Sequence, residues 1–166
     1  MHIPHEYKFQ MDEKDDAAKL QFSAEWESAQ CLNISEVESV LRGPFTRMQA
    51  EGKISQHLDR AYRHALKFSR IRDLQQLQQL RVNLEDWEPP SALGALAQDA
   101  DSVRLAPFEV SQLVNLMPTD ADEAKGLIPS LSRFQNADVM AALEILGNYS
   151  KLQMGGGSAI AFPAEF

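Results

Sequence analysis

The chain has 166 residues, and its 44% hydrophobic and 24% charged residues exclude wholesale disorder and a coiled-coil rod. No apolar stretch approaches the roughly 18 residues that a membrane span needs, and the single cysteine, Cys31, excludes an internal disulfide and fits a reducing compartment. The net charge of −8 argues against a protein that binds nucleic acid on its own through the phosphates.

Residues 1–30 form an acidic segment, with three lysines against seven acids, and do not look like a self-standing fold. Polar and apolar residues alternate over 19–23, which predicts a short strand containing Leu20 and Phe22. One short strand is not stable alone in water, and the rest of the chain offers no second convincing strand. We interpret the segment as an extended strand that pairs with a partner's sheet; the alternative is a floppy acidic tail.

A helical domain is predicted over residues 31–152, so the expected fold class is mainly α. Ser35 and Glu38 have the spacing of a capping box at the start of a first helix, which Gly43-Pro44 is expected to end. Further helices are expected at about 55–70, after Asp73, from Pro107, after a cap at Thr119 and after Asn136, with Gly147 ending the last one.

Two stretches interrupt or follow this domain. Residues 83–104 are predicted to form a surface insertion, because Trp87-Glu88-Pro89-Pro90 is incompatible with a helix interior, and Trp87 is its aromatic anchor. The insertion is acidic, with five acids and no base over 85–102. Residues 153–166 include three consecutive glycines and are expected to form a flexible tail.

Signatures of catalysis, metal binding and phosphate binding are absent from the sequence: it contains no GxxxxGK[ST], no HExxH, no CxxC and no GxSxG. His2 and His5 have the spacing HxxH, but no nearby cysteine or third histidine supplies the further ligands that a metal site needs. Cys31 is expected to be a small buried residue rather than a nucleophile. No catalytic residue, metal site or cofactor is therefore predicted.

The stretch 53–84 is basic, with seven lysines and arginines against two acids. Arg60, Arg63, Lys67 and Arg70 follow one another at spacings of three, four and three, which places them on one face of the second helix. We name these four residues the basic stripe. The favoured interpretation is a solvated face whose charges pair with the acidic insertion; the alternative is a site for an acidic partner or an RNA backbone.

Several blocks of sequence resemble one family. The most distinctive are LAPFEVSQLVNL at 105–116 and DEAKGLIPSL at 122–131. The blocks DAAKL at 16–20, CLNISEV at 31–37 and FSR at 68–70 follow the same order and approximate spacing. Together the blocks cover roughly residues 15–150 and are similar to the fourth subunit of eukaryotic RNA polymerase II, the helical subunit of its stalk.

The resemblance implies a non-catalytic subunit whose helical bundle is of the type found at the ends of some helicases and RNase D-like ribonucleases. It also implies an obligate heterodimer with a second stalk subunit, which carries an OB-fold and makes most of the RNA contact. The pair is expected to dock near the clamp of the polymerase core, to support initiation and handling of nascent RNA, and to be nuclear.

Two other functions remain open on the sequence: a stalk subunit of another nuclear RNA polymerase, and a helical nucleic-acid-binding module that uses the basic stripe. The run Leu-Ile-Pro-Ser-Leu at 127–131 favours polymerase II. No membrane contact is expected.

The apolar residues near the start of the chain are predicted to form the partner-binding surface. Burying one such side chain contributes about 1.5–3 kcal/mol, so a handful can anchor a permanent interface. The residues expected to do so are Leu20, Phe22, Trp26, Leu32, Ile34, Val37 and Leu41.

Overall fold

The computed structural model describes residues 16–23, 29–91 and 104–156, with side chains described up to residue 149. In these ranges the chain forms six α-helices and short 3-10 helices, and its one β pairing is an isolated bridge between Asp16 and Gln21. The mainly α fold class is therefore confirmed. No helix of the described ranges is long and apolar enough to cross a membrane.

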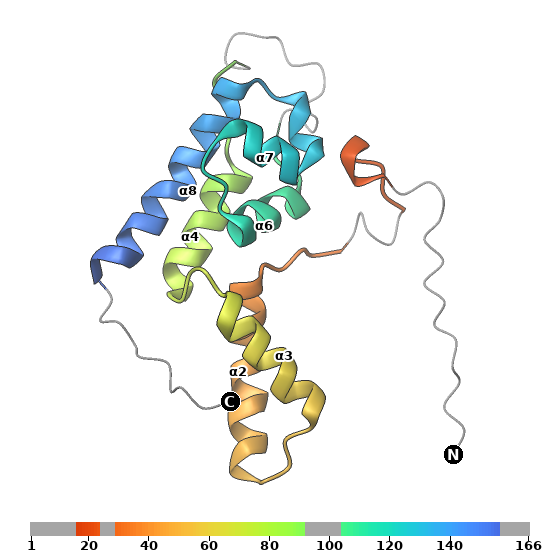
Figure 1. Ribbon diagram of the computed structural model, residues 1–166, viewed down its shortest axis with the longest axis vertical. Helices are drawn as coiled ribbons and strands as arrows, with labels where there is room; N and C mark the ends of the chain where they lie inside the picture. The colour runs from red at the N-terminus through yellow and green to blue at the C-terminus, as the bar shows by residue number, and fades with distance from the viewer. Residues whose placement is uncertain (1–15, 24–28, 92–103, 157–166) are drawn as a thin grey trace.

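Helices α2 (Ile34–Ala50) and α3 (Gln56–Phe68) form a hairpin that projects from the rest of the molecule (Figure 1). The rings of Phe45 in α2 and Tyr62 in α3 stack with their centroids 4.2 Å apart. Gly52 lies between the two helices with a φ of 66°, a conformation that glycine adopts without strain. Because only two helices pack together here, each keeps a wide exposed face.

The hydrophobic core lies in a bundle of four helices: α4 (Leu74–Glu85), α6 (Pro107–Leu116), α7 (Ala121–Leu127) and α8 (Asn136–Gly156). The 3-10 helix η3 (Pro129–Arg133) joins α7 to α8 (Figure 1). On α4, the side chains of Leu77, Leu80 and Leu84 are at most 1% exposed, so one face of this helix is fully buried. The core residues that meet them include Val110, Leu113, Val114, Leu131, Val139 and Leu146.

Trp87, the aromatic anchor predicted for the insertion, is buried against the bundle. Its ring packs edge-on against that of Phe134 with centroids 5.4 Å apart. The Ser91 amide and hydroxyl both donate to the carboxylate of Asp138 at the start of α8, at 3.0 and 2.6 Å. Residues 92–103, the remainder of the acidic insertion, lie outside the described residues.

The carboxylate of Asp138 is expected to make stability depend on pH in the acidic range. Burial opposes its ionisation, but the hydrogen bonds from Ser91 and from the Gln135 amide, together with the charge of Lys125, outweigh this effect and hold the pKa of Asp138 below its ordinary value of 3.8. Since the folded pKa lies below the unfolded one, the stabilisation is fully present above the unfolded pKa and is lost as pH falls through the folded pKa.

Urea unfolding from about pH 5 down to about pH 2 measures this effect. Asp138→Asn should lose less stability over that range than the parent protein, because its side chain does not titrate. Two identical pH profiles would contradict the assignment.

The predicted start of α2 is wrong by two residues. The side chain of Asn33, not that of Ser35, caps the helix by accepting the amide of Glu36 at 3.0 Å, and the Glu36 carboxylate completes the capping box by accepting the amide of Asn33 at 2.9 Å. The Ser35 hydroxyl is engaged elsewhere, because it accepts a hydrogen bond from the amide of Ile71 at 3.2 Å. A tertiary contact therefore decides between two overlapping capping patterns.

Three further predicted helix boundaries are wrong. Pro44 lies inside α2, which runs on to Ala50. The carboxylate of Asp120, not Thr119, caps α7 by accepting the amide of Glu123. Helix α8 continues past Gly147 to Gly156, so it enters the segment 153–166 that the sequence predicts as a flexible tail.

Candidate partner-binding surface

The predicted N-terminal strand has a different conformation in this structure. Residues Ala17–Lys19 form the 3-10 helix η1, and Leu20 has a φ of 56°, so the segment 19–23 is not a continuous extended strand. A carboxylate oxygen of Asp16 caps the turn by accepting the amide of Ala18 at 3.0 Å. The tight turn removes the regular alternation that a strand requires.

The N-terminal segment contacts the chain's own bundle. The ring of Phe22 lies edge-on to that of Phe108 in α6, with centroids 5.2 Å apart. Both Leu20 and Phe22 are half-buried, so part of their predicted partner-binding surface is already covered. Trp26 lies outside the described residues.

The predicted residues around the start of α2 form a more open surface. Leu32 is 45% exposed, and Ile34, Val37 and Leu41 are half-buried. Leu41 lies one helical turn before Phe45 and so shares the side of α2 that meets α3. Val40, a residue absent from the predicted set, is 63% exposed and lies one turn after Val37. Leu32, Val37 and Val40 together are named the α2 apolar face.

A charged network fixes this face relative to the bundle. The guanidinium of Arg81 in α4 donates to both carboxylate oxygens of Glu36, at 2.7 and 2.5 Å. It also donates to the carbonyl of Cys31 at 2.8 Å and to Glu85 at 3.0 Å. Burial alone would lower the pKa of Arg81, but its hydrogen bonds to Glu36 and Glu85 raise it above its ordinary value. The arginine therefore stays charged and holds the start of α2 in place.

Two residues of α6 complete this attachment. Asn115 accepts the backbone amide of Ile34 at 2.8 Å, and the Ser111 hydroxyl donates to the carbonyl of Cys31 at 3.0 Å. The residues in each contact are about 80 positions apart in the sequence. No local pattern in the sequence indicates them.

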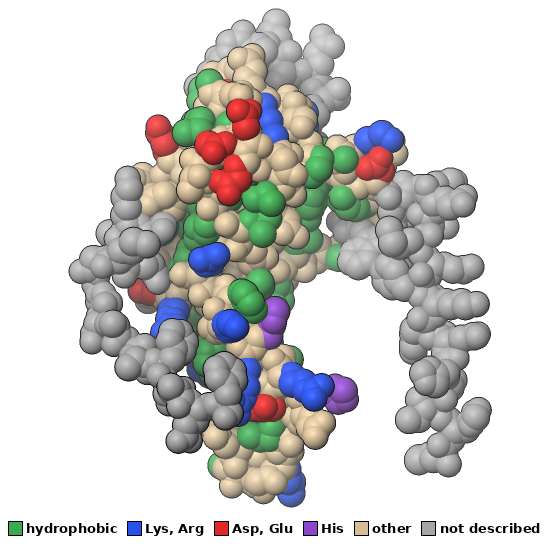
Figure 2. Space-filling model, viewed as in Figure 1, with side chains coloured by type: hydrophobic (Ala, Val, Ile, Leu, Met, Phe, Trp, Pro, Cys, Tyr) green, Lys and Arg blue, Asp and Glu red, His purple; other side chains and the backbone are tan. Residues whose placement is uncertain are grey.

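Arg60, Arg63 and Lys67 of the basic stripe lie on α3 as predicted, whereas Arg70 lies two residues past the end of that helix. Lysine, arginine and histidine side chains gather over α3 in Figure 2, and Arg60, Arg63, Lys67 and Arg70 are all exposed. Arg63 pairs with Asp59 of its own helix at 2.8 Å. Within the described ranges, no residue of the stripe pairs with an acid of the insertion.

Aromatic rings accompany the stripe. Phe68 at the end of α3 is 45% exposed, and the imidazole of His64 lies 4.6 Å from its ring centre. The Lys67 ammonium lies 5.6 Å from the same ring centre. Cations and an exposed aromatic ring therefore share one surface. Among the described residues there is no group of three or more histidine, cysteine, aspartate or glutamate side chains that could hold a metal ion.

The described residues thus form a helical protein, in which a core bundle carries a hairpin with exposed apolar residues near the start of α2 and basic residues on α3. A model of the family described as RNA polymerase Rpb4 matches residues 18–150, and the chain belongs to this family.

Relatives from three eukaryotes show the same similarity. The chain is 26% identical to DNA-directed RNA polymerase II subunit rpb4 of Dictyostelium discoideum over 159 residues, which cover 85% of this chain and 92% of the relative. It is 26% identical to DNA-directed RNA polymerase II subunit 4 of Arabidopsis thaliana over 142 residues, 82% of this chain and 91% of the relative. Subunit RPB4 of Saccharomyces cerevisiae is 37% identical over 82 residues, 49% of this chain and 37% of the relative. The resemblance drawn from the sequence blocks is confirmed.

Proposed function

We propose that this chain is the non-catalytic helical subunit of the RNA polymerase II stalk and that it forms a heterodimer with a second stalk subunit. The family match over residues 18–150 carries the proposal, and the relatives are named as subunits of RNA polymerase II rather than of another nuclear polymerase. On this proposal the protein is nuclear, and the pair docks near the clamp of the polymerase core and supports initiation. The bundle is then of the helicase and RNase D C-terminal type.

The α2 apolar face is the proposed contact with the second subunit. Leu32 and Val40 are exposed large hydrophobic side chains close to the joint with the bundle. Residues Leu20, Phe22, Trp26, Ile34 and Leu41 belong to the proposed interface at its edges. A permanent interface typically buries more than about 2,000 Å², so Leu32, Val37 and Val40 supply its anchors rather than all of its area.

Val40→Asp is expected to weaken the heterodimer at least about tenfold, because a carboxylate would be buried without a partner. The change should leave the chain folded, since Val40 is 63% exposed in the free chain. Co-expression with the second stalk subunit, followed by titration of the purified chains in an ultracentrifuge, measures the affinity.

Val82→Asp is the matched control, because Val82 on α4 is also exposed, at 48%. The control should retain the parental affinity. A Val40→Asp chain that pairs as tightly as the parent would remove the α2 apolar face from the interface.

The accompanying aromatic ring favours a second candidate function for the basic stripe, contact with single-stranded RNA. Bases stack on exposed aromatic side chains while cations follow the phosphates. Phe68, His64 and Lys67 offer this combination. On the main proposal this contact is secondary, because the partner's OB-fold makes most of the RNA contact.

The salt dependence of RNA binding tests this candidate. If all four residues of the stripe contact phosphates, the affinity of the full chain for a single strand should fall with a log–log slope of about −3. Replacing Lys67 by glutamine should make the slope shallower by about 0.7. A salt-independent affinity would exclude the stripe from RNA binding.

A further inference from the structure

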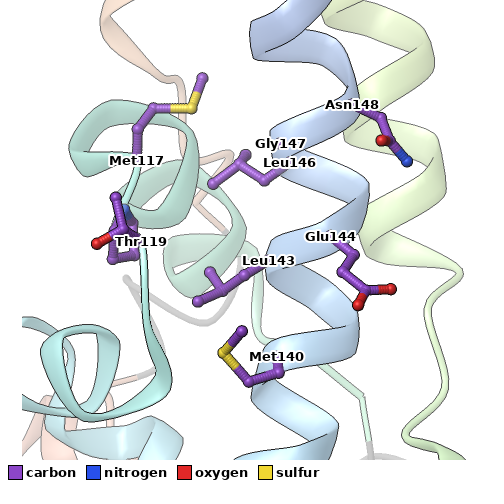
Figure 3. Close-up of a pocket in the computed structure, with 9 residues that line it drawn as sticks. Met117, Thr119, Met140, Leu143, Glu144, Leu146, Gly147 and Asn148 are labelled. Atoms are coloured by element: carbon purple, nitrogen blue, oxygen red, sulfur yellow. The ribbon is translucent and has the colours of Figure 1, made fainter.

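A groove lies between the end of α6 and α8, and no residue of the α2 apolar face lines it. Its volume is about 500 Å³. Figure 3 shows Met117 and Thr119 on one side of it and Met140, Leu143 and Leu146 of α8 on the other. Met140 is 39% exposed, and methionine side chains adapt to differently shaped apolar ligands.

Two local features keep the groove open. Met117 has a φ of 50° and ends α6, and the chain turns at the buried Pro118 before α7 begins. On the α8 side, Gly147 lines the groove without a side chain, and a Cβ atom built there would meet nothing within 4 Å. The groove is therefore open because the backbone turns away after α6 and because Gly147 has no side chain to fill it.

The edge of the groove is acidic. Glu144 lines it, and Glu123 accepts hydrogen bonds from the amide and hydroxyl of the lining residue Thr119, at 2.7 and 2.9 Å. No lysine or arginine is among the lining residues. Lys125 of α7 donates to the carbonyl of Phe134 at 2.7 Å and to the side-chain oxygen of Asn136 at 2.6 Å. Figure 2 shows acidic side chains gathered over the upper part of the molecule and basic side chains over α3, toward the lower end of the same face.

We propose that this groove binds a basic amphipathic segment of a partner protein. An apolar side chain of the segment would pack on the two methionines and on Leu143, and its lysine or arginine residues would face Glu144 and Glu123. Charge complementarity selects this occupant over the chain's own C-terminus, because residues 157–166 carry one acid, Glu165, and no base. The proposal goes beyond heterodimer formation, since α2 contributes nothing to the groove.

Substitutions at Gly147 separate filling of the groove from damage to the fold. Gly147→Leu puts a side chain into the open space, whereas Gly147→Ala leaves most of it free. Both replacements favour the helix over glycine, so both variants should melt at or above the parental temperature. Glu144→Lys, at an exposed position, reverses the charge at the edge.

A displayed library of random peptides of about 12 residues, selected on the immobilised full chain, provides the probe. The enriched peptides should combine an apolar residue with two or more lysines or arginines. Their dissociation constants should rise at least about tenfold on Gly147→Leu and on Glu144→Lys, and stay within about twofold on Gly147→Ala. Their affinity for the parent should also fall with added salt.

Several outcomes overturn the proposal. Enrichment of no peptide, or of acidic ones, would show that the groove does not select basic segments. Equal affinity for the parent and Gly147→Leu would place the binding site elsewhere. Peptides that bind about tenfold tighter to a chain ending at residue 156 would assign the groove to the C-terminal residues. If the parent chain self-associates and Gly147→Leu abolishes this association, the groove would be assigned to the basic stripe of a second copy.

Discussion

Replacing Glu109 with alanine is expected to lower the free energy of unfolding by about 3–5 kcal/mol. The side chain of Glu109 is fully buried at the start of α6. It accepts hydrogen bonds from the Ser130 hydroxyl, from the Arg133 guanidinium, and from the amide of Ala106 at 2.7 Å. Removing the carboxylate leaves these donors without their partner and separates α6 from η3.

Urea unfolding of the parent and of Glu109→Ala measures the loss. Glu109→Gln is the matched control: it keeps the size of the side chain and one acceptor but loses the charge opposite Arg133, so its loss should be intermediate. A loss below about 1 kcal/mol for Glu109→Ala would contradict the role of this network in the bundle.

Replacing Arg81 with alanine is expected to lower stability by about 2–4 kcal/mol and to loosen the hairpin. Its side chain is 14% exposed and that of Glu36 is 17% exposed, so removing the arginine leaves a largely buried carboxylate uncompensated. The contacts to Glu36 and to the Cys31 carbonyl also join α4 to the start of α2. The effect should therefore be largest in the hairpin.

Hydrogen exchange locates this effect. Amides of α2 should exchange faster in Arg81→Ala, while those of α8 should keep more of their protection at low denaturant. Arg81→Lys is the control, because it keeps the positive charge but not the two parallel hydrogen bonds to Glu36. Unchanged protection in α2 would show that Asn115 and Ser111 hold the joint without the arginine.

The helices themselves could be predicted from the sequence, because their signals are local. The spacing of Leu77, Leu80 and Leu84 identifies the buried face of α4, and Pro107 marks the start of α6. Trp87 could be predicted as an anchor, since a tryptophan beside two prolines is outside a helix but needs burial.

The helix ends could not all be predicted, because tertiary contacts override local breakers. Pro44 lies in the projecting hairpin, where the stacking of Phe45 on Tyr62 holds α2 beyond it. Helix α8 passes Gly147 because the hydroxyl of Tyr149, farther along it, accepts a hydrogen bond from Asn83 of α4 at 2.8 Å.

Only part of the predicted site could be found from the sequence, again because contacts between distant residues decide the rest. Arg60, Arg63 and Lys67 share one helix, so their spacing is sufficient to place them together, but Arg70 lies past the helix end, where spacing does not apply. The partner-binding set mixes α2 residues with an N-terminal segment whose Phe22 contacts Phe108, a contact between residues 86 positions apart. The groove beside Gly147 depends on how α6, α7 and α8 pack, and the sequence carries no local sign of it.

On the proposed function, another polypeptide of RNA polymerase II covers the α2 apolar face. Affinity purification of the chain from native nuclear extract, with quantitative mass spectrometry of the eluate, tests this directly. We expect the large polymerase II subunits and one small stalk partner in equal amounts, all reduced together by Val40→Asp. Recovery of the chain alone as a folded monomer, or with another polymerase only, would contradict it.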